Sequence, residues 1–129
     1  MKKMILLFSH KLNDKQIENA KKDFAISKFV YLQKEFQYIW SHINPDIKTL
    51  ENTLEPICKY LENTVSKGDI VLIQGDFGAC FIMVNLCKKL GAIPVYATTE
   101  RITKEYINDD GKLEKKSIFE FRRFREYGV

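Results

Sequence analysis

Two short apolar segments, MILLF at Met4–Phe8 and DIVLIQ at Asp69–Gln74, constrain the fold of this chain more than any other feature. Strands that are apolar on both faces are typical of parallel sheets covered by helices on each side. The segments Lys28–Leu32 and Ala92–Thr99 are predicted as further strands of that sheet. Because helical patterns separate these strands, the sequence predicts one α/β domain over residues 1–129.

Apolar residues at intervals of three and four positions predict helices between the strands. The first helix is expected to begin after Asn13, because Gln16 stands where a capping box requires Glu or Gln. A second helix is predicted over residues 36–43, and a largely buried one over residues 79–91, with Gly91 at its end. The right-handed crossover rule then limits how these helices cover the sheet.

The segment from Asn44 to Gly68 is predicted as the longest helix. Asn44 is expected to be its N-cap, and Pro45 occupies the first turn, where proline is tolerated. Gly68 is expected to end it. Pro56 falls inside the apolar stripe and is expected to kink the helix or split it in two, because proline lacks the backbone N–H.

After Thr99 the pattern changes and predicts an antiparallel hairpin. Its arms are residues 102–107 and 112–127, and the sequence NDDG at Asn108–Gly111 forms its turn. The expected architecture is a Rossmann-like parallel sheet of about four strands, with helices on both faces and this hairpin at the C-terminus.

The net charge of +4 is concentrated at the two ends of the chain, whereas the centre is mildly acidic. This distribution suits a phosphate-bearing partner. The three cysteines form no CxxC pair, which favours a reducing cytoplasm, and no apolar run reaches transmembrane length. The sequence therefore predicts a cytoplasmic protein without a membrane partner.

Polar residues follow the first predicted strand, where ligands bind to open α/β sheets. If the first and third strands are neighbours, Ser9 and His10 line the same crevice as the segment QGDFGA at Gln74–Ala79. His10 can donate to a phosphate or move a proton near neutral pH, and its alternative role is a bond to the local backbone. Ser9 can bind a phosphate oxygen or the local turn.

The segment QGDFGA is predicted to form a turn before a helix. Gly75 and Gly78 allow a ligand to approach the backbone closely, and the amides that enter the helix favour anions. Asp76 would repel a phosphate, so it either caps the helix or faces sugar hydroxyls. Phe77 can stack on a base.

The fourth predicted strand ends in YATTER at Tyr96–Arg101. Thr98 and Thr99 can hydrogen-bond to a ribose or a phosphate, and Arg101 is a natural phosphate clamp. The alternative interpretation is a strand end that carries a solvated charge.

In the last predicted strand, Arg122, Arg123 and Arg125 are interleaved with Phe121 and Phe124. This composition resembles a nucleic-acid surface, and it is also typical of an edge strand guarded by charges. In a regular strand, Arg123 would share the face of Phe121 and interrupt it.

Spacings typical of known catalytic or metal sites are missing from the sequence. The two histidines and three cysteines do not have metal-ligand spacing, and no Ser-His-Asp order or pair of catalytic carboxylates is recognisable. The residue patterns therefore predict a cytosolic α/β domain with an anion-binding crevice.

Four blocks in order, LLFSHKL, QGDFGA, VYATTER and FEFRRFREY, resemble the small CRISPR-associated Csx-twenty family of type III CRISPR ring nucleases. The resemblance spans essentially the whole chain. It implies a CARF-like fold, a homodimer, and hydrolysis of a cyclic oligoadenylate second messenger, with cyclic tetra-adenylate as the expected ring. It implies no cofactor, no metal and no long nucleic-acid partner.

The implied reaction is attack of a ribose 2′-hydroxyl on the adjacent phosphorus, which leaves 2′,3′-cyclic phosphate ends. The protein would align the reacting oxygens and stabilise charge on the phosphorane. The residues implied as catalytic are His10, Asp76 and Arg101. Those implied in ligand binding are Ser9, Gln74, Gly75, Phe77, Gly78, Ala79, Thr98, Thr99 and Arg123.

Two other functions are consistent with the same residues. A non-catalytic module would hold the ring intact, as a sponge or as a regulatory subunit. A nucleotide-binding α/β protein unrelated to ring nucleases is the third possibility, because each motif is weak when taken singly.

Overall fold

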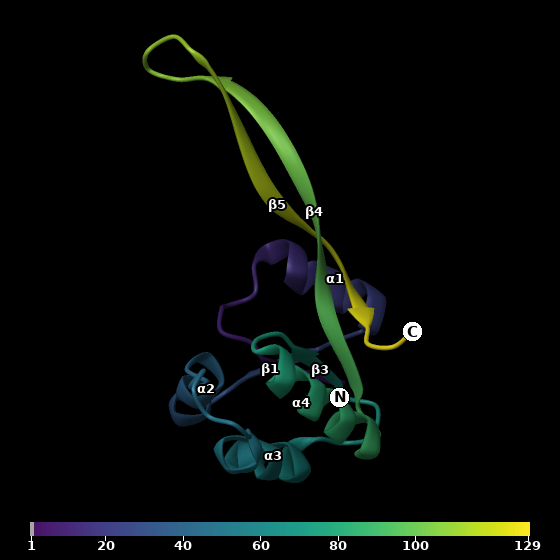
Figure 1. The fold of residues 1–129 in the computed structure, drawn as a ribbon. Coiled ribbons are helices and arrows are strands. Elements are labelled where there is room, and N and C mark those ends of the chain that lie inside the picture. Colours follow the sequence, from purple (N-terminus) through teal and green to yellow (C-terminus); the bar gives the residue numbers. More distant parts are fainter. Residues whose placement is uncertain (1) are drawn as a thin grey trace.

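The computed structural model describes residues 2–129, and Met1 of the predicted domain lies outside the described residues. Its centre is a five-stranded sheet with the order β2-β1-β3-β4-β5 (Figure 1). The first four strands of this order run parallel, and β5 runs antiparallel to β4. The strands are β1 (Lys3–Leu7), β2 (Lys28–Tyr31), β3 (Ile70–Ile73), β4 (Ile93–Ile107) and β5 (Leu113–Glu126). The α/β class, the parallel sheet and the C-terminal hairpin are thus confirmed.

Helices cover both faces of the sheet, as predicted. The helices are α1 (Asp14–Phe24), α2 (Lys34–Ser41), α3 (Glu51–Thr64) and α4 (Phe77–Lys89). Alternate residues of β1 point to opposite faces: Ile5 and Leu7 pack with α2, α3 and α4, whereas Met4 and Leu6 pack with α1. All four side chains are buried, which explains why this strand is apolar throughout.

The caps of two helices follow the predicted chemistry. At α1, the Asn13 side chain accepts from the Gln16 N–H at 2.9 Å, and the Gln16 side chain accepts from the Asn13 N–H at 2.9 Å. At the end of α4, Gly91 has φ +80° and donates to the Lys88 carbonyl, while Ala92 donates to the Cys87 carbonyl. This is a Schellman motif, for which glycine is the favoured residue.

The prediction for the longest helix is wrong at both ends. The helix α3 begins at Glu51 rather than after Asn44, because the Asn44 side chain instead accepts from the Asp46 N–H at 2.9 Å and closes a local turn. It ends at Thr64, four residues before Gly68. The helix is also not split at Pro56.

Three buried side chains of α3 explain why the helix continues through its proline. Leu54, Ile57 and Leu61 lie on both sides of Pro56 and are almost completely buried in the core. Packing of this apolar face stabilises the helix against the loss of one backbone hydrogen bond.

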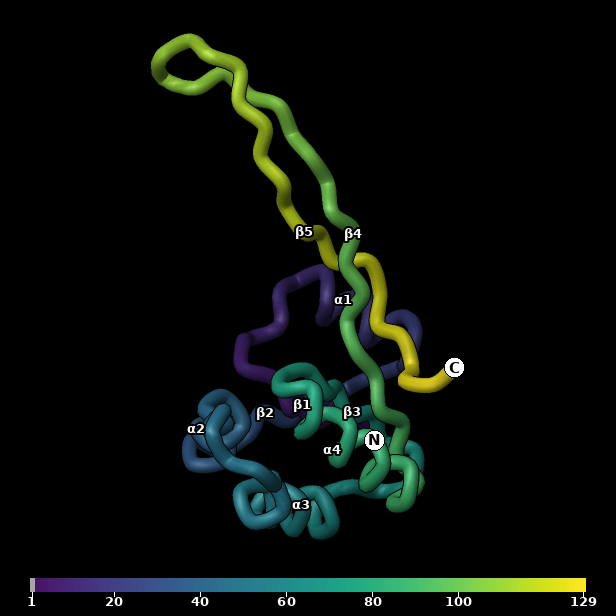
Figure 2. Tube along the Cα trace, in the orientation of Figure 1, coloured from purple at the N-terminus to yellow at the C-terminus, as the bar shows by residue number. Residues whose placement is uncertain are grey.

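The fourth strand does not end at Thr99. Instead β4 continues to Ile107 and forms, with β5, a two-stranded arm that projects beyond the rest of the molecule (Figure 2). The turn of the arm lies at the predicted residues, and Gly111 there has φ +77°. The residue pattern changes after Thr99 because β4 pairs there with β5 alone, beyond its pairing with β3, and both faces of the strand become exposed.

A β-bulge at the root of the arm changes the expected faces of β5. Thr98 pairs with Arg123 and Thr99 pairs with Phe121, so Arg122 has no partner on β4. Phe121 and Phe124 therefore point to the same face, with ring centroids 4.9 Å apart. The prediction that Arg123 interrupts the face of Phe121 is wrong, because this extra residue reverses the alternation.

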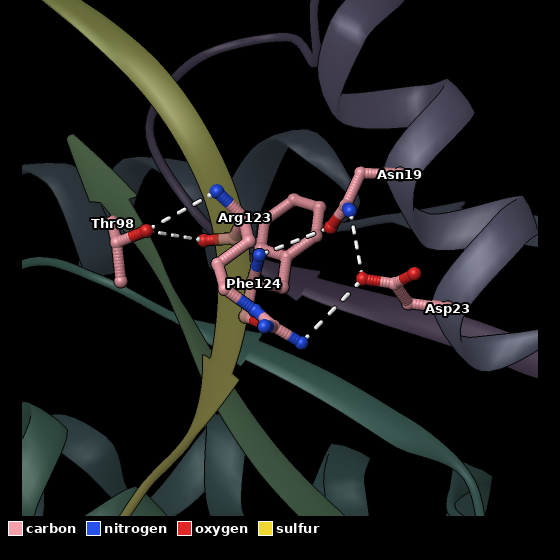
Figure 3. Close-up of polar contacts among 5 residues, drawn as sticks. All are labelled: Asn19, Asp23, Thr98, Arg123 and Phe124. Atoms are coloured by element: carbon pink, nitrogen blue, oxygen red, sulfur yellow. Dashed lines mark hydrogen bonds and ion pairs between the residues drawn. The ribbon is translucent and has the colours of Figure 1, made fainter. Parts of the chain in front are cut away.

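The root of the arm is attached to α1 (Figure 3). The Phe124 side chain is completely buried, and its backbone N–H donates to the Asn19 side chain at 3.0 Å. Beside it, the Arg123 guanidinium lies 3.6 Å from the Asp23 carboxylate. The arm is thus fixed to the domain at one end.

Candidate functional site

The candidate site lies at the edge of the sheet where β1 and β3 end. These strands are neighbours, and the ladder continues one residue further, since Gln74 donates to the Leu7 carbonyl at 3.0 Å. From this edge, β1 connects to β2 on one side and β3 connects to β4 on the other. Such a switch point is where open α/β sheets bind ligands. The loops that carry Ser9 and Gly75 therefore leave the sheet side by side.

The C-terminal turn of α2 joins these two loops. Trp40 is buried, and its indole N–H donates to the Gln74 carbonyl at 2.9 Å. The next residue, Ser41, donates to the Ser9 hydroxyl at 2.9 Å. A Cβ on Gly75 would lie 2.9 Å from the Trp40 indole nitrogen, so packing against this ring requires glycine there. Trp40 is a core residue, in agreement with its apolar spacing.

A first hollow of about 270 Å³ lies on the β1 side of this edge. It is lined by Phe8, Ser9, His10, Lys11, Tyr31, Leu32 and Gln37. His10 is exposed, and its ring packs edge-on against Phe8 at 5.4 Å between centroids. Gln37 donates to the Phe8 carbonyl at 2.9 Å and orders the loop. The hollow combines a hydroxyl, an imidazole and an ammonium group, and these can all bind a phosphate.

A second hollow of about 480 Å³ lies between α4 and β4 and is mostly apolar. It is lined by Gln74, Gly75, Phe77, Cys80, Phe81, Val84, Tyr96 and Tyr127. Phe77 is 94% exposed and Phe81 is 70% exposed. The Gln74 side chain accepts from the Ala97 N–H at 2.6 Å and links the end of β3 to β4. An aromatic wall of this kind can stack on a flat base.

Asp76 caps α4. Its carboxylate accepts from the Ala79 N–H at 3.0 Å, so this part of the predicted anion site is already occupied by an internal acceptor. Ala79 itself is buried. A Cβ on Gly78 would lie 3.1 Å from Leu50, so close packing with the segment before α3 accounts for this glycine.

Replacing Asp76 with alanine is expected to lower the free energy of unfolding by about 1 kcal/mol, because the cap of α4 is lost. Asp76→Asn is the matched control, since asparagine is an equally good N-cap and removes only the charge. Urea denaturation of the three proteins measures both effects. Equal losses for the two variants would contradict a capping role.

The remaining predicted residues lie outside both hollows. The Thr98 hydroxyl donates to the Arg123 carbonyl at 2.9 Å and accepts from the Arg123 N–H, so it supports the root of the arm (Figure 3). Arg101 lies on the arm and donates to Ser117 at 3.2 Å. Thr99 pairs with Phe121 at the bulge. The structure thus gathers Ser9, His10, Gln74, Gly75, Asp76 and Phe77 at the sheet edge, and separates Thr98, Thr99, Arg101 and Arg123 from them.

Several residues in or beside the two hollows are absent from the sequence-based set. Ser41 and Gln37 reach the first loop from α2, and Tyr127 reaches the second hollow from the end of the chain. Nothing in their local sequence marks these three residues. Phe81 is different, because it follows Phe77 by one helical turn and an exposed aromatic pair was recognisable from that spacing.

Burial keeps the phenol of Tyr127 and two thiols protonated. Tyr127 donates to the Ile73 carbonyl at 2.6 Å, and burial raises its pKa to about 12. Burial likewise raises the pKa of Cys87 to about 12 and raises the pKa of Cys80. These cysteines are therefore poor nucleophiles near neutral pH. Within residues 2–129, no three His, Cys, Asp or Glu side chains are grouped as metal ligands.

The raised pKa of Tyr127 predicts a loss of stability at alkaline pH. An unfolded tyrosine ionises near pH 10, whereas folded Tyr127 keeps its proton to about pH 12. The folded state therefore binds more protons in this interval, and the free energy of unfolding falls as the pH rises through it. In Tyr127→Phe the urea midpoint should fall less steeply between about pH 10 and pH 12. Identical slopes for the two proteins would contradict this assignment.

The structure contains no helix in residues 2–129 with the length and apolar character needed to cross a membrane.

Two comparisons with known proteins give matches that cover nearly the whole chain. A family model described as "Uncharacterized protein MJ1673 family" matches residues 2–125. The curated "Uncharacterized protein MJ1673" of Methanocaldococcus jannaschii is 49% identical over 127 residues, 98% of each chain. No solved structure matches.

Proposed function

This chain belongs to the MJ1673 family, and we propose that it is a ring nuclease that binds cyclic tetra-adenylate and linearises it. In this proposal the domain is a CARF-like member of the Rossmann-like folds, it works as a homodimer in the cytoplasm, and it switches off type III CRISPR signalling. The proposal rests on the sequence resemblance and on the geometry of one edge of the sheet.

The observation that carries the proposal is the adjacency of β1 and β3. It brings the loop with Ser9 and His10 beside the loop with Gln74 and Gly75, at a switch point that suits nucleotide binding. In this proposal the hollow at Ser9, His10 and Lys11 takes a phosphate, and the aromatic hollow at Phe77 takes an adenine. The two hollows match the alternation of phosphates and bases in an oligoadenylate.

The proposed reaction depends mainly on how the protein positions the reacting atoms of the ring. A ribose 2′-hydroxyl attacks the neighbouring phosphorus, the bond to the 5′-oxygen breaks, and a 2′,3′-cyclic phosphate remains. His10 is the candidate for moving the proton, and Ser9 and Lys11 are the nearest groups that can bind the phosphate oxygens. Arg101 and Arg123 lie on the arm and its root, so in this proposal they act only on parts of the ring outside the hollows.

A binding module that holds the ring intact is the second candidate, and the position of Asp76 favours it. Its carboxylate is bonded to the helix it caps, so it is not free to serve as a general base through that oxygen. A site without an available carboxylate depends on His10 for proton transfer. Cleavage of the ring by the parent protein therefore separates the two candidates, and loss of His10 tests its role in the enzyme.

The test is incubation of the purified protein with cyclic tetra-adenylate and excess EDTA, followed by mass spectrometry of the products. Linear oligoadenylates with cyclic phosphate ends support the enzyme. Tight binding with the ring recovered intact supports the module, and no binding rejects both. His10→Ala is expected to reduce turnover at least about 100-fold if His10 transfers the proton.

His42→Ala is the matched control for His10→Ala. His42 is exposed, stacks on Tyr38 and lies outside both hollows. Its loss should leave binding and turnover at the parent level. Equal turnover of the parent, His10→Ala and His42→Ala would remove His10 from the mechanism.

A further inference from the structure

The last residue of α2, Ser41, contacts the candidate site without lining it. Its hydroxyl donates to the Ser9 hydroxyl at 2.9 Å. Ser9 lines the polar hollow, whereas Ser41 is not among the described residues that line either hollow. Ser41 can thus influence a ligand in the polar hollow by way of Ser9.

A third side chain fixes the direction of this hydrogen bond. The Gln37 amide nitrogen donates to the Phe8 carbonyl at 2.9 Å, and it also donates to the Ser41 hydroxyl oxygen at 3.5 Å. A backbone carbonyl can only accept, so the amide of Gln37 must have its nitrogen on this side. Because the Ser41 oxygen accepts from Gln37, the Ser41 proton is available for Ser9.

Ser9 therefore keeps its own proton for another acceptor. A serine hydroxyl has one O–H group to donate, and its oxygen accepts. The Ser9 oxygen already accepts from Ser41, so the Ser9 O–H group is left to donate elsewhere. Ser9 is exposed, and within residues 2–129 its hydroxyl has no hydrogen-bond partner other than Ser41. In the polar hollow this donor can bond to a ligand.

Two further side chains of the polar hollow suit a ligand with negatively charged oxygens. Lys11 carries an ammonium group, which can only donate, and the His10 imidazole can donate as well. None of the residues given above for this hollow is acidic. Asp14 and Glu35 are close to them in the sequence but do not line the hollow. A phosphate, whose ionised oxygens only accept, matches this set of donors.

We propose that Ser41 is a positioning residue, which accepts from Gln37 and donates to Ser9 so that the Ser9 O–H group is held as a donor to a phosphate oxygen. The inference rests on the proposed function, because it takes the polar hollow as the phosphate site of that function. It adds a residue of α2 to a site formed by the loops after β1 and β3. A donor that is oriented in advance costs less to order when the ligand binds.

A double-mutant cycle tests whether Ser41 acts through Ser9. NMR titration, which also detects weak binding, gives the Kd of cyclic tetra-adenylate and of AMP for the parent, Ser9→Ala, Ser41→Ala and the double variant. Ser9→Ala should raise the Kd about 10-fold, because a hydrogen bond to a charged group is lost. Ser41→Ala should raise it about 3-fold in the parent and leave it unchanged in the Ser9→Ala background. Ser41→Thr keeps the hydroxyl and should bind like the parent.

Adenosine separates positioning from a general loosening of the loops. It carries the base and the ribose without a phosphate, so Ser41→Ala should weaken the binding of AMP and leave that of adenosine unchanged. Equal weakening of both would overturn the inference, because Ser41 would then only order the loop. Ser27→Ala is the matched control and should have no effect. Ser27 is another exposed serine, and its hydroxyl donates to the Lys2 carbonyl at 3.1 Å where β1 and β2 begin, at the opposite edge of the sheet.

The outcomes distinguish this inference from the proposed function. If the ring binds and the effects of the two substitutions add, the inference is overturned and the proposed function stands. If AMP binds with the non-additive pattern but the ring does not bind, the proposed function is rejected and the inference is supported. If neither phosphate-bearing probe binds, both are overturned. Circular dichroism of each variant confirms that it is folded.

Discussion

Replacing Trp40 with alanine is expected to lower the free energy of unfolding by about 3–5 kcal/mol. The Trp40 side chain is only 2% exposed, and it fills the space between α2 and the turn at Gly75. Alanine leaves a cavity there and leaves the Gln74 carbonyl without its indole partner.

Two measurements test the role of Trp40. Urea denaturation gives the loss of stability, and Trp40→Phe is the matched control because it keeps an aromatic ring and removes the N–H donor. The control should lose roughly 1–3 kcal/mol. Hydrogen exchange at residues 74–76 should rise more in Trp40→Ala than in the control. A loss below about 1 kcal/mol in Trp40→Ala would show that the ring is not packed as described.

Replacing Phe124 with alanine is the second large expected effect, again about 3–5 kcal/mol. Phe124 is completely buried beneath α1 and is the largest side chain that fixes the root of the arm. Its loss should loosen the arm as well as the domain. Hydrogen exchange should therefore rise along β5 together with the fall in the urea midpoint.

Phe119→Ala is the matched control for Phe124→Ala on the same strand. Phe119 is 70% exposed in one chain, so its loss should change the stability of the monomer by no more than about 0.5 kcal/mol. A similar loss of unfolding free energy in both variants would contradict the difference in burial between Phe119 and Phe124. The measurement needs low protein concentration so that the monomer is the species observed.

The sheet could be predicted from the sequence because its signals are local. A strand buried on both faces must be apolar throughout, and Met4–Phe8 and Asp69–Gln74 satisfy this rule within a residue or two of β1 and β3. The cap at Asn13 depends on side chains three residues apart, so it was predictable for the same reason.

The predictions for the start of α3 and for the faces of β5 were wrong because the local sequence there is compatible with two different structures. Asn44 and Pro45 are as good at starting a turn as at starting a helix, and the side-chain bond to Asp46 selects the turn. The bulge opposite Thr98 depends on pairing with another strand. The spacing of three between Phe121 and Phe124 was a usable clue, because two aromatic residues at that spacing cannot share a face in a regular strand.

The candidate site was predictable only in part. The loops after β1 and β3 follow from the fold, so the sequence alone predicts that Ser9 and Gly75 lie at one edge of the sheet. Arg101 was grouped with them on the assumption that the fourth strand ends at Thr99. The strand continues, so this side chain lies on the arm instead. Ser41 and Tyr127 arrive through tertiary packing, which no local pattern encodes.

The continuity of β4 has a structural consequence. The strand β4 contains no glycine and no loop, and it belongs both to the core and to the arm. The β-bulge lies at the boundary between these two parts. At the root of the arm this strand contains Ala97, whose N–H donates to the Gln74 side chain. One uninterrupted strand and one hydrogen bond thus connect the arm to the turn before α4.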